Sequence, residues 1–445
     1  MLWATYCFFP ERFGGTEVYV AGAARGLRRL GHSVSVVAGT TRATSSPTTP
    51  FEIRETNYEG IPVHFFSIRT EGLRWEELLC LEAEALTAWW REWLKRNPYD
   101  LLHVHGYSPV CSGSLVTAAK QMGLPVAMSF HHPGLLCARG DFVQAWNHPC
   151  DGQVRVGRCS VCFGLTKVKA LMAERQGDSA VPSPNTESGG RELRFKMGTA
   201  FSLTRQFRLK LRSWNRLISQ VDGWHAFSDQ TRGMLLRNGV PESRIQMIPH
   251  AVELPAAITR KESPVIRVGC IGRFHPEKGT HLLVQAIQKI PERLPLQFIF
   301  YGMAHGEREK KVQALVAALA QRDPRVALAG SFEPAHLAEV FSGLDVVVVP
   351  SIAFETGPLV ALEAFHAGIP VVGPRWGSLP SLVKDGVNGL LFPWADARAL
   401  ARCLQRIATE PDLLKQLQSG VRPPGNMENH VQALLGFYER LLKCR

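Results

Sequence analysis

In the second half of the chain, short apolar runs alternate with amphipathic stretches. The apolar runs are continuous, which is typical of strands buried on both faces of a parallel sheet. The stretches between them carry the three-to-four-residue period of a helix. This pattern predicts a doubly wound, Rossmann-like α/β domain. The predicted strands are 265–272, 296–302, 325–330, 345–350 and 369–373, with helices beginning near 279, 306, 334 and 359.

The first half of the chain shows the same alternation less regularly. A helix with a glycine-rich start is predicted over 14–31. The alternation as a whole predicts a second α/β domain. Its predicted strands are 1–7, 32–39, 61–67, 100–106, 124–131, 223–229 and 244–250. Helical patterns over 396–419 and 427–443 end the chain, separated by the breaker GVRPPGN.

The chain is too long for one core, because it has 445 residues. A polar, proline-bounded segment near 255–264 marks the expected boundary. We therefore predict one domain over 1–258, a second over 259–425, and a terminal helix over 426–445 that crosses back to the first domain. Residues from about 135 to 205 are predicted to be a cysteine-rich and basic insertion in the first domain.

The composition is that of a soluble globular protein, with 45% hydrophobic and 20% charged residues. The sequence has no apolar stretch long enough for a transmembrane helix, and its first residues lack the basic region and cleavage site of a signal peptide. We expect a cytoplasmic protein whose cysteines are thiols or metal ligands. The formal charge of +12 favours an anionic partner such as a nucleotide, a phosphate, a nucleic acid or an acidic membrane face.

The segment FETGPLVALEAF places two carboxylates around the start of a helix, directly after a buried strand. Pro358 suits the first helical turn, and the N-terminus of a helix binds anions well. Carboxylates such as Glu355 and Glu363 accept hydrogen bonds from vicinal hydroxyls. Simple stabilisation of the helix end would account for one glutamate but not for both. The segment therefore predicts that a sugar-like polyol is bound beside a diphosphate.

A second turn, GRFHPEKGT, joins a predicted strand to a helix and carries Arg273 and Lys278. It is not a phosphate-binding P-loop, because Glu277 stands where the glycine before the lysine is required. The planar fork of an arginine and the point charge of a lysine both suit phosphate oxygens. Since the chain contains no Asp-x-Asp, we expect these cations and a helix end, not a catalytic metal, to neutralise the diphosphate.

These segments, together with PERFGGTEVYV, DLLHVHG, RIQMIPHAVEL and VKDGVNGLLF, resemble family 4 of the retaining nucleotide-sugar glycosyltransferases. The resemblance covers the chain apart from about 135–205. It implies the GT-B fold, in which two Rossmann-like doubly wound domains face each other across a cleft, with the acceptor on the N-terminal side and the nucleotide sugar on the C-terminal side. It also implies transfer of a hexosyl unit, with retention, from a nucleotide-diphosphate sugar to a saccharide or lipid-linked acceptor, in polysaccharide or glycolipid biosynthesis.

The resemblance also implies roles for individual residues. The expected catalytic residues are His131, Glu355, Arg273 and Lys278, with the neighbouring His132 as an alternative for the histidine. The expected donor-binding residues are Gly14 and Gly15 at a helix start, Arg273 and Lys278 on the diphosphate, Glu355, Thr356 and Gly357 on the sugar, and Glu363 on the ribose. The run ETGPL replaces the commoner EGFGL type, so contacts to the sugar are expected to differ.

Two other functions are compatible with parts of the sequence. One is a sugar-nucleotide epimerase of the same GT-B fold, against which the complete set of motifs argues. The other is a zinc-containing protein that binds nucleic acid, which the positive charge and the cysteines favour. This reading leaves Glu355 and Glu363 unexplained, since carboxylates repel a phosphate backbone, and we expect no nucleic-acid partner.

The insertion contains four of the ten cysteines in the spacing C-x12-C-x8-C-x2-C: Cys137, Cys150, Cys159 and Cys162. Four thiolates can complete a tetrahedral zinc site, and the final C-x2-C is typical of a zinc knuckle. We predict a structural zinc centre that shapes a lid on the acceptor side. The alternatives are free thiols, a redox pair or an iron–sulfur cluster, with His131, His132 or His148 replacing one ligand.

The stretch 191–216 carries eight lysines and arginines and one acidic residue, with aromatic and aliphatic residues interleaved. Such a basic amphipathic helix can lie on an anionic membrane. It can equally pack its apolar side on the first domain and leave a solvated face. Membrane contact would make the protein peripheral at the inner membrane face.

Overall fold

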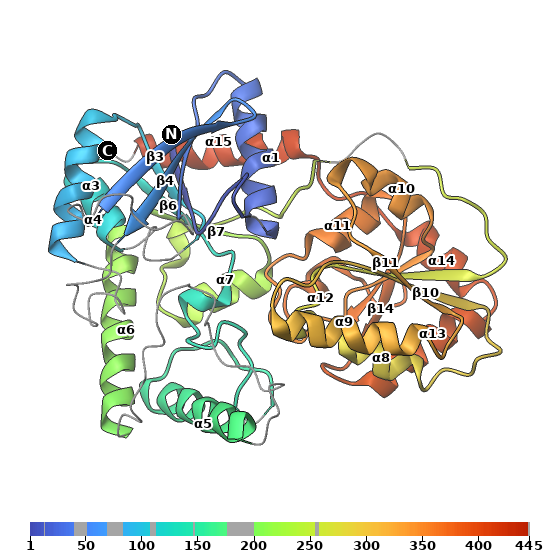
Figure 1. Cartoon of the computed structure of the whole chain (residues 1–445). Helices are drawn as coiled ribbons and strands as arrows, with labels where there is room; N and C mark the ends of the chain where they lie inside the picture. Colours follow the sequence, from blue (N-terminus) through green and yellow to red (C-terminus); the bar gives the residue numbers. More distant parts are fainter. Residues whose placement is uncertain are drawn as a thin grey trace. The chain divides into compact units, whose positions relative to one another are not determined.

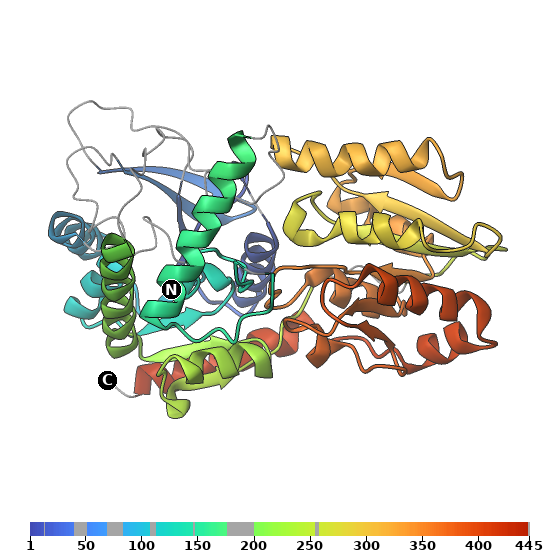
Figure 2. The ribbon, with the colours of Figure 1, turned by 90° about the horizontal axis from the view of Figure 1, so that it is seen from below.

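The computed structural model of the chain describes residues 1–12, 14–39, 51–68, 83–106, 113–145, 147–175, 200–253 and 258–443. They form two compact α/β units, which Figures 1 and 2 show in two orientations. The first unit ends at His250 and resumes at Asn426, so that it includes the last helix; the second runs from Ala251 to Gly425. Residues 176–199 of the predicted insertion lie outside the described residues.

The first unit is built on an eight-stranded sheet in the order β3-β4-β2-β1-β5-β6-β7-β8. Its neighbouring strands are parallel, except that β3 and β4 form an antiparallel hairpin at the edge. The strands are β1 (Leu2–Thr5), β2 (Ser35–Gly39), β3 (Phe51–Tyr58), β4 (Ile61–Ile68), β5 (Leu102–Val104), β6 (Val126–Ser129), β7 (Gly223–Ala226) and β8 (Ile245–Met247). The α-helices are α1 (Gly15–Arg29), α3 (Glu84–Arg96), α4 (Gly113–Gln121), α5 (Val156–Arg175), α6 (Ala200–Gln220), α7 (Asp229–Arg237) and α15 (Met427–Lys443).

The second unit is built on a six-stranded parallel sheet in the order β11-β10-β9-β12-β13-β14. The strands are β9 (Ile266–Ile271), β10 (Leu296–Tyr301), β11 (Val326–Gly330), β12 (Val346–Val348), β13 (Val371–Pro374) and β14 (Gly389–Phe392). The α-helices are α8 (Thr280–Ile287), α9 (Glu307–Ala320), α10 (Leu337–Ser342), α11 (Leu359–His366), α12 (Leu379–Leu382), α13 (Ala397–Thr409) and α14 (Leu413–Gly420). The predicted doubly wound α/β architecture is therefore confirmed.

The run of valines in β12 illustrates how both faces of this sheet are covered. Val346 and Val348 pack into the cluster that α8, α9, α13 and α14 form on one face. Val347 and Val349 pack into the cluster of α10, α11 and α12 on the other face. Side chains of a strand alternate between its faces, so a strand covered on both sides must be apolar throughout.

The order of the strands reverses beside β9. The chain proceeds from β9 outward to β10 and β11, and then returns so that β12 lies on the other side of β9. In sheets of this type, ligands bind outside the carboxyl ends of the strands at this reversal. The loops that follow β9 and β12 are joined there, because the N–H groups of Ile352 and Ala353 both donate to the carbonyl of Glu277, at 2.9 and 3.2 Å.

The structure differs from the predicted elements in two places. The helix predicted over 396–419 is two helices, since Pro411 cannot continue a helix and Asp412 adopts a φ of 59°. The strand β3 was not predicted, because it lies at the edge of the sheet and its polar residues obscure the apolar alternation.

The helix α6 corresponds to the basic stretch. Its Phe207, Trp214 and Leu217 are buried in the first unit, and the Trp214 indole donates to the carbonyl of Asn238 at 2.8 Å. The apolar side is thus packed against the protein. Arg205, Arg208, Arg212 and Arg216 remain exposed along the helix. No helix in the described part of the chain is long and apolar enough to span a membrane.

The loop before α8 yields a prediction about Gly279. Its φ of 71° is left-handed, and an added Cβ would lie 2.0 Å from the carbonyl oxygen of Pro350. Gly368 has a φ of 70° but nothing within 4 Å of an added Cβ. We expect Gly368→Ala to lower the free energy of unfolding by roughly 1–2 kcal/mol and Gly279→Ala to lower it further, in urea titrations. Equal losses would contradict the close approach of the two loops.

Candidate functional site

The two loops at the reversal bring together Lys278 and Glu355. Lys278 ends the 3₁₀ turn Pro276–Lys278 after β9, and its Nζ donates to Oε1 of Glu355 at 2.7 Å. The hydroxyl of Ser351, at the end of the β12 strand, donates to the same oxygen at 2.7 Å. The sequence predicted that both residues contact one ligand but did not predict that they contact each other.

A third loop holds the backbone of Glu355. The N–H of Ser378, after β13, donates to the carbonyl of Glu355 at 2.8 Å. The neighbouring Gly377 has a φ of 64°, and a Cβ there would lie 2.9 Å from the Glu355 nitrogen. The position of Glu355 therefore depends on the ends of three adjacent strands.

Arg273 follows the same strand as Lys278 and is half exposed. Its guanidinium lies 3.6 Å from a carboxylate oxygen of Glu309, whose side chain is buried. Glu309 in turn accepts the N–H of His305 at 2.6 Å and so caps the start of α9. Sequence reasoning missed Glu309, although a glutamate three residues after a helix cap is a recognisable signal.

Glu363 lies on the fifth residue of α11, as the motif predicted, and is half-buried. Desolvation raises the pKa of its carboxyl to about 7. Among the described residues its carboxylate has no hydrogen-bond or ion-pair partner. It is therefore a polar group available to the hydroxyls of a ligand. Thr356, in the loop before this helix, is buried, and Gly357 follows it.

In the first unit, Gly14 and Gly15 form the start of α1. The N–H of Gly14 donates at 2.8 Å to the carboxylate of Glu17, which also accepts the hydroxyl of Thr5 at 3.1 Å. Glu17 is buried, and desolvation raises its pKa despite these hydrogen bonds. The helix start thus already holds an acidic side chain of its own, which the sequence reasoning did not consider.

The structure distinguishes His131 from His132. His131 follows β6, is buried, and its Nε2 lies 3.1 Å from Nδ1 of His105. His132 is exposed, and its Nδ1 accepts the N–H of Gly134 at the start of a 3₁₀ turn. His132 therefore has a local capping role, whereas His131 belongs to a buried polar cluster.

That cluster contains further histidines that the sequence did not indicate. The ring of His131 lies next to Tyr19 and to His250, at centroid distances of 5.1 and 5.6 Å. Burial lowers the pKa of every histidine in the cluster, to about 3 for His225 and about 4 for His430. The cluster members are His103, His105, His131, His225, His250 and His430.

Backbone carbonyls fix the direction of the hydrogen bonds in this cluster. Nε2 of His225 donates to the carbonyl of Ile248 at 2.8 Å, so its Nδ1 must accept from the hydroxyl of Ser129 at 2.9 Å. Ser129 therefore accepts from Nε2 of His103, whose Nδ1 accepts from Tyr438 at 2.6 Å. Each imidazole in this chain is neutral and has one defined tautomer.

The tautomer of His131 follows from its partner. Nε2 of His105 is buried and has no partner among the described residues. A buried donor without a partner is rarer than an acceptor without one, so the proton of His105 belongs on Nδ1, where it donates to Nε2 of His131. His131 then carries its own proton on Nδ1.

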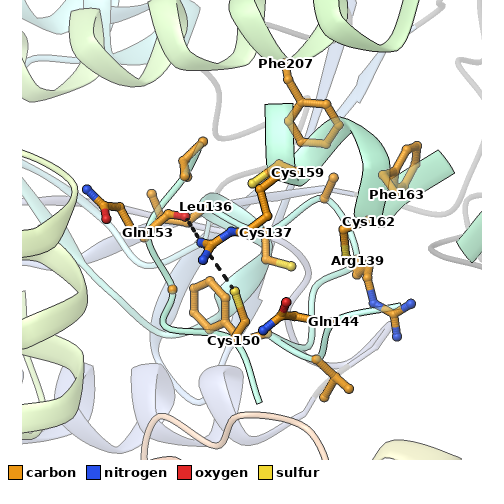
Figure 3. A pocket seen from close by; sticks show the side chains of 16 residues that line it. Leu136, Cys137, Arg139, Gln144, Cys150, Gln153, Cys159, Cys162, Phe163 and Phe207 are labelled. Atoms are coloured by element: carbon orange, nitrogen blue, oxygen red, sulfur yellow. Dashed lines mark hydrogen bonds between the residues drawn. The ribbon is translucent and has the colours of Figure 1, made fainter. Parts of the chain in front are cut away.

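Four cysteines with free thiols line one cavity in the first unit (Figure 3): Cys137, Cys150, Cys159 and Cys162. Within the described ranges, no three His, Cys, Asp or Glu side chains stand in a ready-made metal-binding arrangement. The four sulfurs thus surround the cavity without forming a coordination sphere, and the zinc centre stays a prediction.

Two family models match the chain in sequence. Residues 14–251 match the model described as a glycosyl transferase 4-like domain, and residues 266–410 match that of glycosyl transferases group 1. A D-inositol 3-phosphate glycosyltransferase of Acidothermus cellulolyticus is 28% identical over 97% of this chain and 87% of its own length.

Solved structures show the same fold. Anabaena HepE in complex with UDP and glucose aligns with a TM-score of 0.62 at 17% identity, over 98% of both chains. A sucrose-phosphate synthase from Thermosynechococcus elongatus aligns with a TM-score of 0.65 at 20% identity, over 100% of both chains. These matches support the GT-B fold and give no support to the epimerase or to the nucleic-acid-binding protein.

The buried histidines predict how stability depends on pH. They stay neutral in the folded protein, whereas a histidine in the unfolded chain gains a proton below about pH 6.5. The free energy of unfolding should therefore fall as the pH drops from 6.5 towards 4, by about 1.4 kcal/mol per pH unit for each such histidine. Urea titrations at several pH values measure this slope.

A matched pair of variants tests the origin of the slope. His430→Gln should reduce the slope of the free energy of unfolding against pH by the contribution of one histidine, because a glutamine does not titrate. His32→Gln, at an exposed position, should leave it unchanged. An unaltered slope in His430→Gln would show that His430 is not held neutral by burial.

Proposed function

The chain belongs to family 4 of the GT-B glycosyltransferases, and from this we propose that it transfers a hexosyl unit from a nucleotide-diphosphate sugar, with retention of configuration. The proposed acceptor is a saccharide or a lipid-linked saccharide, in polysaccharide or glycolipid biosynthesis. The observation that supports this most directly is the contact of Lys278 with Glu355 at the reversal of the strand order.

The second unit supplies the donor-binding groups in this proposal. Lys278 and Arg273 neutralise the diphosphate, and the start of α11 adds the dipole of a helix N-terminus. Glu355, with Thr356 and Gly357 beside it, accepts the hydroxyls of the donor sugar. Glu363 accepts the two ribose hydroxyls, which its lack of a protein partner supports.

The proposed chemistry is a front-face displacement. The bond between the anomeric carbon and the diphosphate oxygen breaks, and the acceptor oxygen forms its bond to that carbon from the same face. The departing diphosphate takes the acceptor proton, and Lys278 and Arg273 stabilise the charge that develops on it. No side-chain nucleophile and no catalytic metal enters this proposal.

His131 contributes a hydrogen bond to the donor sugar in the proposed mechanism. Its neutral state suits this role, because a neutral imidazole places no second positive charge beside the oxocarbenium-like centre. Gly14 and Gly15 lack side chains of their own, so a phosphate could approach the backbone at the start of α1, where it would have to displace the carboxylate of Glu17 from the N–H of Gly14.

The exposed arginines of α6 support an electrostatic contact with an anionic membrane. The apolar side of this helix is buried, so the contact would involve charge at the surface and not insertion into the bilayer. Such a contact would suit a lipid-linked acceptor and a peripheral position at the inner membrane face.

The direct test is a panel of UDP-, GDP- and ADP-sugars with saccharide and lipid-linked acceptors. An active donor should raise the melting temperature and release nucleoside diphosphate. NMR of the product should show the anomeric configuration of the donor. Inversion would refute the proposed displacement, and the absence of release with every donor would refute the transferase function.

Lys278→Met tests the cation at the diphosphate. Loss of one such electrostatic contact typically lowers the rate by a factor of about 10²–10³, so we expect kcat/KM to fall by that factor. Lys289→Met removes an exposed lysine from the end of the neighbouring helix and should have no effect. Unchanged turnover in Lys278→Met would refute its assignment.

Glu363 makes donor binding dependent on pH. Its pKa of about 7 means that the carboxylate becomes ionised, and a stronger hydrogen-bond acceptor, as the pH rises through neutrality. The KM for the donor should therefore fall between pH 6 and 8. Glu363→Gln should abolish this dependence and raise KM about tenfold at pH 8. Glu292→Gln, at an exposed position, is the control, and a persistent pH dependence in Glu363→Gln would contradict the assignment.

A further inference from the structure

Three separate segments of the first unit contribute sulfur to the cavity of Figure 3, and Phe207 of α6 also lines it. Cys137 lies in the loop after a 3₁₀ turn, and Cys150 follows a short bridge between Val143 and Pro149. Cys159 and Cys162 lie one turn apart at the start of α5, so they face the same side of that helix. In Figure 3 the four side chains converge from different directions.

Each of the four sulfurs also faces backbone N–H groups. The N–H of Ala145 donates to Sγ of Cys162 at 3.3 Å, and the N–H of Arg155 donates to Sγ of Cys159 at 3.4 Å. The backbone N–H of Phe142 donates to the sulfur of Cys137, and that of Gly152 donates to the sulfur of Cys150. A thiolate accepts such bonds more strongly than a thiol, and outer hydrogen bonds of this kind orient metal ligands.

Charged side chains surround the cavity. Arg139 and Arg158 line it, and each is paired with a carboxylate, Arg139 with Asp141 and Arg158 with Asp151. The guanidinium of Arg158 lies 3.8 Å from Sγ of Cys150. Lys210 of α6 interacts electrostatically with Cys137 and Cys159 while it donates to the carbonyl of Gly134 at 3.2 Å. Four thiolates around a divalent ion carry a net charge of −2, which Lys210 and the N–H groups around the sulfurs offset in part.

The backbone around the cavity has little regular structure and two residues in a left-handed conformation. Phe142 and Asn147 adopt φ angles of 53° and 60°, a left-handed conformation that costs a non-glycine residue roughly 1–2 kcal/mol. Between η1 (Pro133–Leu135) and α5 the described residues contain no helix and no strand longer than one bridge. A segment with so little regular structure is typical of regions held by a covalent or metal cross-link.

We propose that Cys137, Cys150, Cys159 and Cys162 bind one Zn²⁺ ion as a structural centre that ties the two loops to the start of α5. Four sulfur donors in tetrahedral positions are the ligand set of structural zinc sites. Binding draws the sulfurs inward from the wall of the cavity to Zn–S distances of about 2.3 Å. Each coordinated thiol loses its proton to the solvent, so up to four protons are released for each ion bound. This proposal does not depend on the glycosyl transfer.

The protein purified under reducing conditions without added metal provides the first test. We expect about one zinc and no iron per chain by elemental analysis. Removal of the zinc by a chelator should lower the melting temperature, and stoichiometric Zn²⁺ should restore it. Replacement by Co²⁺ should produce the sulfur-to-cobalt charge-transfer band and the intense visible bands of a tetrahedral thiolate site.

Single Cys→Ser variants identify the ligands. Each of Cys137→Ser, Cys150→Ser, Cys159→Ser and Cys162→Ser should lose the zinc or bind it far more weakly. Cys403→Ser, at a half-buried cysteine of the second unit, should retain it. If a ligand variant fails to fold, the metal content and the Co²⁺ spectrum of the intact protein still decide the question.

Several results would overturn the proposal. Zinc well below one per chain together with no Co²⁺ spectrum would show that the cysteines are plain thiols. Iron with visible absorption would show an iron–sulfur cluster instead. A disulfide between any two of the four cysteines in a peptide map of the protein would show a redox pair.

Discussion

The reversal of strand order beside β9 is the constraint on which the proposed donor site depends. Parallel strands expose their carboxyl ends on one edge of the sheet, and the loops that follow two adjacent strands must share that edge. Because β12 pairs directly with β9, residues that are far apart in the chain become neighbours. The contact between Lys278 and Glu355 is a consequence of this pairing, as are the two hydrogen bonds from the β12 loop to Glu277.

The Lys278–Glu355 ion pair is weak enough for a bound ligand to displace one side chain from the other. Its side chains are 40% and 17% exposed, and ion pairs in such positions contribute only about 0–1 kcal/mol. A diphosphate carries more charge than one carboxylate, so it can take the lysine from Glu355 at little cost. The proposed ligand would thereby free Glu355 for sugar hydroxyls, while Ser351 and Ser378 keep it in position.

In the histidine cluster of the first unit, backbone carbonyls fix the positions of the protons. Its members are buried and neutral, and two of their hydrogen-bond chains end on the carbonyls of Ile248 and Pro249, which can only accept. These fixed acceptors determine every proton position along the chains. Helix α15 takes part through Tyr438 and His430, so the last helix of the chain helps to orient groups around β6.

Local patterns in the sequence were enough to predict the two α/β units, most of their strands and helices, the turns that carry Lys278 and Glu355, and the helix that carries Glu363. They were enough because a strand covered on both faces must be apolar and because Gly and Pro restrict the backbone of turns. The sequence could not show that Lys278 contacts Glu355 or that His131 and not His132 faces inward. Nor could it show that six histidines meet in one core, whereas the spacing of the four cysteines did predict that they come together. Each of these depends on which strands pair and how segments distant in sequence pack, and only the tertiary structure decides that.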